Sequence, residues 1–139
     1  MGTRLWLNLG YRDAPAAIRF LVEAFGFEKG MVYEGPGEGT IAYAELYWPD
    51  GGGVLLYTAE SEVNSVAGLS AVAATDDGYP AVSMHIDTDD PDALFARVTG
   101  AGVPIVRELA DSPHGTRGFV ARDPEGFYWH FGTPLPGRK

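Results

Sequence analysis

The chain has 139 residues, 45% of them hydrophobic and 21% charged, so it is long enough for one domain with a substantial core. It contains no cysteine, which excludes disulfides, thiolate nucleophiles and cysteine-based zinc sites. A net charge of −9 makes nucleic acid and anionic membranes unfavourable partners.

The first residues alternate between two kinds of side chain. Leu5, Leu7, Leu9 and Tyr11 alternate with Trp6, Asn8 and Gly10, which predicts a strand with two different faces. Asp13 is a suitable N-cap for a helix over residues 14–25, and Gly26 supplies its stop. Its apolar stripe consists of Ile18, Leu21, Val22 and Phe25. Further strands are predicted over residues 28–34, 40–48 and 54–58.

The same order begins again after residues 60–80, a long stretch of small and polar residues that we interpret as a linker. Val82, Met84 and Ile86 alternate with Ser83, His85 and Asp87, which predicts a strand. Asp90 and Pro91 then begin a helix that ends at Gly102, and a strand follows near residues 104–108. Finally, Asp123-Pro124-Glu125-Gly126 has the composition of a type I turn and predicts a hairpin.

The chain therefore reads as an α+β protein built from two tandem βαβββ modules. We expect one domain over residues 1–139, with modules at 4–59 and 81–133, the linker at 60–80 and a tail at 134–139. In each module a helix would cover one face of the sheet and leave the other bare. Pairing the bare faces would enclose a groove suited to a ligand.

These features resemble the vicinal-oxygen-chelate (VOC) superfamily of glyoxalases, bleomycin-resistance proteins and dioxygenases, with the PhnB-like branch the nearest. The resemblance rests on the tandem modules, on Asp13-Ala14-Pro15-Ala16-Ala17 at the first helix, and on Arg117 followed by Arg122-Asp123-Pro124-Glu125-Gly126. It implies a cupped mixed β-sheet (the glyoxalase/bleomycin resistance fold) and a homodimer.

In metal-dependent relatives, His and Glu side chains from the first and last strands of each module hold a divalent ion. The resemblance places these positions on Trp6, on Ser83 or His85, on His130 and near Leu56 or Tyr57. Of these residues only His130, and His85 if the position shifts by two residues, has a side chain that can bind a metal, and a zinc-type site needs about three protein ligands. We therefore predict no metal cofactor.

Strand parity predicts which residues line the groove. They are Trp6, Asn8, Tyr43, Glu45, Tyr47, Ser83, His85, Tyr128 and His130, joined by Phe119 or Arg117 from a neighbouring strand. Several have a structural alternative. Trp6 could fill the core, Tyr43 and Tyr47 could lie in a dimer interface, and His130 could be a buried histidine with a hydrogen-bond partner. Arg117 is expected to pair with Asp123 or Glu125, and His114 to be solvated.

An aromatic groove with one carboxylate suits a planar or cationic organic ligand. The leading hypothesis is a metal-independent small-molecule binding protein that sequesters such a ligand and is not an enzyme. In the alternative, His85, His130 and Glu45 hold one divalent ion (Zn, Ni, Mn or Fe) in a glyoxalase-like lyase/isomerase or a dioxygenase, or His130 and Glu45 act in catalysis. A scaffold with an empty groove is a third hypothesis.

The expected partners are a small organic molecule and a second copy of the chain, without nucleic acid or membrane. The N-terminal residues lack the apolar core of a signal peptide, and no apolar run approaches the ~20 residues of a bilayer span. We therefore expect a cytoplasmic protein.

Overall fold

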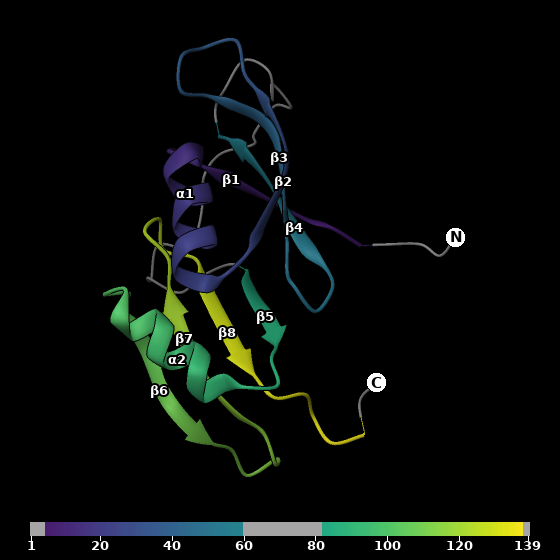
Figure 1. The fold of residues 1–139 in the computed structure, drawn as a ribbon, viewed down its shortest axis with the longest axis vertical. Coiled ribbons are helices and arrows are strands. Elements are labelled where there is room, and N and C mark those ends of the chain that lie inside the picture. The colour runs from purple at the N-terminus through teal and green to yellow at the C-terminus, as the bar shows by residue number, and fades with distance from the viewer. Residues whose placement is uncertain (1–4, 60–81, 138–139) are drawn as a thin grey trace. The chain divides into compact units, whose positions relative to one another are not determined.

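A computed structural model describes residues 5–59 and 82–137. The chain divides into two compact units, residues 1–72 and 73–139, called the first and second unit below. Within the described residues, each unit holds one four-stranded mixed sheet and one helical segment (Figure 1). The predicted linker over residues 60–80 lies outside the described part of the chain. None of the helices in the described part has the length and apolar character of a membrane span.

The first unit contains β1 (Leu7–Tyr11), β2 (Glu28–Glu34), β3 (Ile41–Tyr47) and β4 (Gly53–Thr58) in the spatial order β1-β4-β3-β2. β1 runs parallel to β4, whereas β2, β3 and β4 form an antiparallel meander. The first strand was predicted to include Leu5, which is wrong. Pairing with β4 begins only at Leu7 opposite Val54, and Leu5 is 99% exposed.

The first helix covers the predicted residues, but its geometry changes part-way. α1 (Ala14–Phe20) begins at Asp13, whose carboxylate accepts a hydrogen bond from the Ala16 amide at 3.1 Å. It continues as a π-helical turn, η1 (Leu21–Phe25), in which the Gly26 amide donates to the Leu21 carbonyl five residues back. This wider turn carries the buried Leu21 and Phe25.

The second unit repeats this topology. β5 (Ser83–Asp87), β6 (Ile105–Asp111), β7 (Arg117–Arg122) and β8 (Tyr128–Gly132) lie in the order β5-β8-β7-β6, with β5 parallel to β8. α2 (Pro91–Gly100) begins at the predicted N-cap, where the Asp90 carboxylate accepts from the Ala93 amide at 3.0 Å. The internal repeat predicted from the sequence is therefore present in the strand order.

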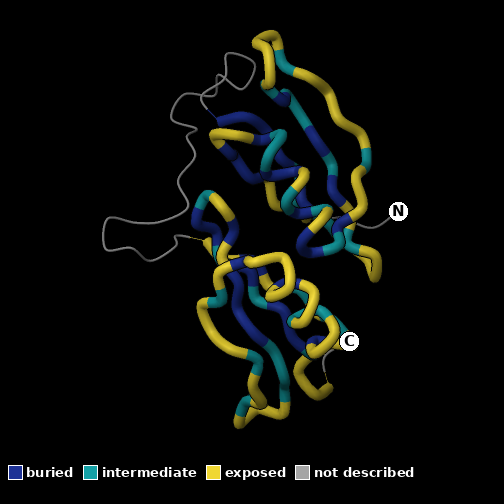
Figure 2. The backbone as a smooth tube through the Cα atoms, turned by 60° about the vertical axis from the view of Figure 1, so that its left-hand side comes forward, coloured by how far each residue is buried: buried dark blue, intermediate teal, exposed yellow. Residues whose placement is uncertain are grey.

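In each sheet, the strand residues divide into an inner set that faces the helix and an outer set that does not. α1 contacts β1, β3 and β4, and α2 contacts β6 and β7. The inner set holds the fully buried side chains Tyr11, Leu46 and Leu56 in the first unit, and Phe119, Trp129 and Phe131 in the second. The end strands β2 and β6 are exposed along most of their length (Figure 2).

The predicted hairpin between β7 and β8 is confirmed, and a buried carboxylate holds it. Asp123 is 3% exposed, and its Oδ1 accepts hydrogen bonds from the Glu125 and Phe127 amides, both at 3.0 Å. Its Oδ2 accepts from the indole Nε1 of Trp129 at 3.0 Å. The turn is therefore tied directly to the largest buried side chain of the second unit.

Candidate functional site

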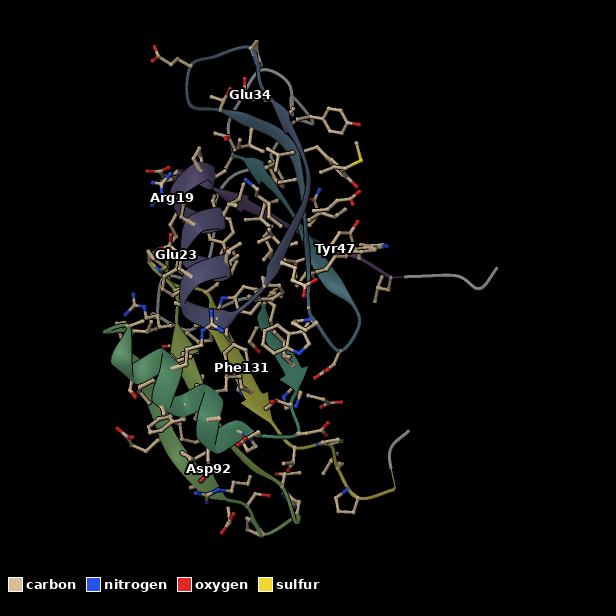
Figure 3. The ribbon with its side chains drawn as sticks, in the orientation of Figure 1. Arg19, Glu23, Glu34, Tyr47, Asp92 and Phe131 are labelled. Carbon is tan, nitrogen blue, oxygen red and sulfur yellow. The ribbon has the colours of Figure 1, made fainter. Side chains whose placement is uncertain are left out.

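The outer face of the first sheet gathers aromatic side chains around one carboxylate. We call this set the aromatic face; it consists of Trp6, Tyr33, Tyr43, Glu45 and Tyr47. Tyr43, Glu45 and Tyr47 are alternate residues of β3, so they project from the same side of the strand. Tyr47 lies on the side of the sheet away from α1 (Figure 3).

Glu45 binds both neighbouring phenols. The Tyr43 hydroxyl donates to Glu45 Oε1 at 2.6 Å, and the Tyr47 hydroxyl donates to Oε2. These two hydrogen bonds stabilise the carboxylate and hold the pKa of Glu45 below its usual value. The same bonds raise the pKa of Tyr47, and they raise the pKa of Tyr43 to about 12. The face therefore carries one negative charge at neutral pH, between two neutral phenols.

The flanking rings are packed against this cluster. The Trp6 ring meets the Tyr47 ring edge to face, with ring centroids 6.1 Å apart. The ring centroids of Tyr33 and Tyr43 are also 6.1 Å apart. Gly30 of β2 makes room for Tyr47, since a Cβ at residue 30 would lie 2.4 Å from the Tyr47 ring. The aromatic side chains are thus placed by contacts with one another and with the sheet, while Tyr33 and Tyr47 stay 53% and 38% exposed.

Asn8 lies on the same outer face, because it pairs with Leu55, which in turn pairs with Glu45. Its side chain is exposed. The structure thus brings together four predicted groove residues of the first unit, Trp6, Tyr43, Glu45 and Tyr47, and places Asn8 on the same surface.

The predicted residues of the second unit share the outer face of the second sheet. Ser83 pairs with Tyr128, and His85 pairs with His130, whose ring stacks on the His85 ring at 6.1 Å. Partial burial lowers the pKa of His130, and the positive charges of His85 and Arg107 lower it further. His85 also lies near Asp87, with Nε2 and Oδ1 3.5 Å apart.

Two predictions for β7 are wrong. Phe119 does not line an outer face, because it pairs with Phe131 and both rings are buried beneath α2, where Phe119 also packs on Phe95. Arg117 does not pair with Asp123 or Glu125. Its guanidinium instead binds Asp92 of α2 through two hydrogen bonds, of 2.8 and 3.0 Å, and Asp111 of β6 at 3.2 Å. These bonds lower the pKa of Asp92.

Two side chains of these surfaces, Tyr33 and Arg107, were not predicted from the sequence. Tyr33 lies beyond a register shift in β2, so simple alternation along the strand does not give its face. Arg107 is in β6, which also has register shifts on both sides of this residue. Tyr33 is the one aromatic residue of β2 and Arg107 the one basic residue of β6, so composition gave no signal for either.

A family model of the Glyoxalase/Bleomycin resistance protein/Dioxygenase superfamily matches residues 4–131. The chain belongs to this superfamily. An uncharacterized protein of Mycobacterium bovis is 36% identical over 124 residues, which cover 88% of this chain and 78% of that protein. An uncharacterized protein of Mycobacterium tuberculosis is equally similar, with 69% of its length covered.

Solved structures share this fold. The crystal structure of TioX from Micromonospora sp. ML1 has a TM-score of 0.72 and 31% identity, covering 96% of this chain and all of TioX. A glyoxalase/bleomycin resistance protein/dioxygenase from Nocardioides has a TM-score of 0.65 at 22% identity, covering 100% of this chain and 87% of that one. The two units of this chain are therefore the tandem modules of the glyoxalase/bleomycin resistance fold.

The side chains in the described residues do not fit the divalent ion that the superfamily resemblance implies. Within residues 5–59 and 82–137, no three His, Asp or Glu side chains come close enough together to hold a metal ion. Glu45 is bound by two phenols, and His85 and His130 supply only two imidazoles on one surface. Among these described residues, neither unit offers a donor set for a metal with about three protein ligands.

Proposed function

We propose that this superfamily member binds a planar, cationic organic molecule on the aromatic face and sequesters it without a metal ion. The observation that carries the proposal is the Glu45 carboxylate fixed between Tyr43 and Tyr47, with Trp6 against Tyr47. Aromatic rings attract cations over their faces and stack on planar ligands, and the carboxylate adds a full negative charge. A neutral planar molecule would gain only the stacking.

The resemblance to the VOC superfamily supports two further parts of this proposal, a homodimer and membership of the PhnB-like branch. A cytoplasmic location, expected from the sequence, is also part of the proposal. Sequestration requires affinity alone, so no general base is assigned. The alternative with His85, His130 and Glu45 around a divalent ion would need the Glu45 carboxylate to leave its two phenols.

Calorimetric titration with a matched pair of probes tests the proposal. N-methylquinolinium is a planar cation, and quinoline is a neutral molecule of nearly the same shape at mildly alkaline pH. We expect the cation to bind more tightly than quinoline. Trp6→Ala should weaken cation binding roughly three- to thirtyfold, and Glu45→Gln should weaken it about fivefold without affecting quinoline.

Glu38→Gln is the matched control, because Glu38 is an exposed residue of the loop between β2 and β3 and its loss changes the charge equally. Equal affinity for the two probes would refute the cationic ligand. Cation binding that survives Trp6→Ala unchanged would place the site elsewhere. Binding that a chelator abolishes would refute metal independence.

A further inference from the structure

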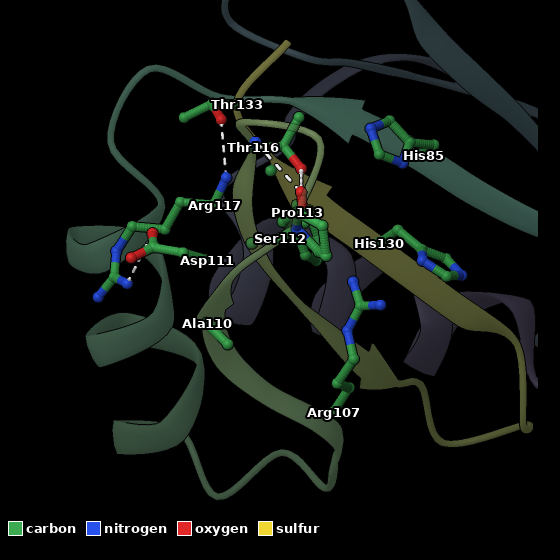
Figure 4. A pocket seen from close by; sticks show the side chains of 13 residues that line it. His85, Arg107, Ala110, Asp111, Ser112, Pro113, Thr116, Arg117, His130 and Thr133 are labelled. Atoms are coloured by element: carbon green, nitrogen blue, oxygen red, sulfur yellow. Dashed lines mark hydrogen bonds and ion pairs between the residues drawn. The ribbon is translucent and has the colours of Figure 1, made fainter. Parts of the chain in front are cut away.

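A hollow lies on the outer face of the second sheet, and the proposed cation site does not use it. Its volume is about 210 Å³, below the ~300–1,000 Å³ of pockets for drug-sized ligands, so it fits a small chemical group. Every residue that lines it belongs to the second unit, between His85 and Thr133 (Figure 4).

The strand register explains both the hollow and its charge. Ala110, Gly118 and Gly132 are paired in one row across β6, β7 and β8, so almost no side chain fills the space above them. Gly118 cannot gain a side chain, because a Cβ there would lie 2.4 Å from the Phe131 carbonyl oxygen. The floor of the hollow is therefore strand backbone.

The adjacent row forms a basic wall. Arg107 pairs with Val120, Val120 with His130, and His130 with His85, so one arginine and two histidines lie in one row across four strands. Arg107 extends toward the side on which His130 lies (Figure 4). Neighbouring strands of a sheet lie about 4.8 Å apart. Arg107 on β6 and His130 on β8 are two strands apart, so an arginine side chain is long enough to reach a group held at His130.

Arg107 and Arg117 differ in their ion pairs. Arg117 is bound by Asp92 and by Asp111, so its positive charge is more than neutralised and it supplies no attraction for an anion. Asp111 is the one carboxylate among the residues that line the hollow. Arg107 has no ion pair with any of the residues that the structure describes. An unpaired guanidinium is suited to bind carboxylate or phosphate oxygens through two parallel hydrogen bonds.

The loop between β6 and β7 adds a neutral donor. Ser112 Oγ accepts the His114 and Thr116 amides, both at 3.2 Å, which uses its two lone pairs. Its own proton therefore goes to Thr116 Oγ1, 2.7 Å away. Thr116 lines the hollow, and its hydroxyl proton remains available to an acceptor there.

We propose that this hollow binds a small oxyanion, a carboxylate or a phosphate group, between Arg107, His130 and the Thr116 hydroxyl. The charged groups around the His130 imidazole are His85 and Asp87 on β5, Arg107 and Asp111 on β6, and Arg117 and Arg122 on β7. Asp87 approaches His85 at 3.5 Å and does not line the hollow.

NMR of the imidazole rings in the full chain tests the proposal, with inorganic phosphate and benzoate as probes. The chain has three histidines, and the exposed His114 serves as an internal reference outside the hollow. We expect saturable shifts of the His130 ring signals and no change at His114. The tighter of the two probes identifies the oxyanion as phosphate or carboxylate.

Arg107→Gln should weaken the tighter probe roughly tenfold or more, since it removes a charge-assisted hydrogen bond. Arg19→Gln removes the same charge from an exposed position of α1 and should change nothing. The proposal is overturned if neither anion gives a saturable shift at His130, if His114 shifts equally, or if Arg107→Gln leaves the affinity intact. These outcomes do not depend on quinolinium binding, so the two sites are tested separately.

Discussion

At the scale of single residues, the most consequential feature is the pair of phenols bound to Glu45. Protonating the carboxylate or ionising a phenol breaks the same hydrogen bonds. The pKa of Glu45 is lowered, so its contribution to stability is present above the ordinary value of 4.5 and is lost as the pH falls through the lowered pKa. The pKa of Tyr43 is raised, so its contribution is full below 10.0 and is lost as the pH rises through about 12.

Glu45→Gln should therefore lower the pKa of Tyr43 from about 12 toward its ordinary 10.0, because a neutral amide no longer favours the protonated phenol. The chain has seven tyrosines, so the titration is best followed through the Cζ chemical shift of each ring. Glu38→Gln serves again as the control and should leave Tyr43 unchanged. If Tyr43 titrates near 10.0 in the unmodified protein, the hydrogen bond to Glu45 is absent in solution.

At the scale of elements, the sequence predicted helices and hairpins best where a local rule fixes the backbone. The N-caps Asp13 and Asp90 and the turn at Asp123 are set by neighbouring residues, and all three are confirmed. The faces of β8 are also as predicted, since polar Tyr128 and His130 alternate with buried Trp129 and Phe131.

Prediction failed where the information is not local. β7 is apolar at successive positions, from Phe119 to Ala121, so alternation along the strand does not define its inner face. Its register against β8 decides that Phe119 is buried. The partner of Arg117 at Asp92 lies 25 residues away and depends on how α2 packs, which no spacing in the sequence reveals.

The hairpin turn offers a direct test of an element. Asp123→Ala leaves the buried indole N–H of Trp129 and two turn amides without their acceptor, so it should lower the free energy of unfolding by about 3 kcal/mol. Urea denaturation measures this change. Asp50→Ala, in the exposed turn between β3 and β4, should stay within about 0.5 kcal/mol of the unmodified protein. Equal effects of the two substitutions would show that Asp123 has no special role.

At the scale of the whole molecule, the two outer faces differ in charge although they come from the same repeated topology. The first sheet presents Glu45 among aromatic rings, and the second presents Arg107 beside two histidines. The chain as a whole carries a net charge of −9, which attracts cations and repels anions. The overall field thus assists the proposed cation site and opposes the proposed anion site, where only local groups supply attraction.

Ionic strength separates these contributions, because the Debye length falls from about 30 Å at 10 mM salt to about 10 Å at 100 mM. Over this range the affinity for N-methylquinolinium should fall severalfold, whereas that for quinoline should stay constant. The affinity for the anion probe should change less, because screening weakens both the pull of Arg107 and the repulsion by the distant acidic residues. Glu45→Gln should keep part of the salt dependence of cation binding, since it removes one negative charge from an excess of nine. If the affinity for N-methylquinolinium does not change with ionic strength, charge contributes nothing to it. Stacking on Trp6 and the tyrosines would then hold the ligand alone.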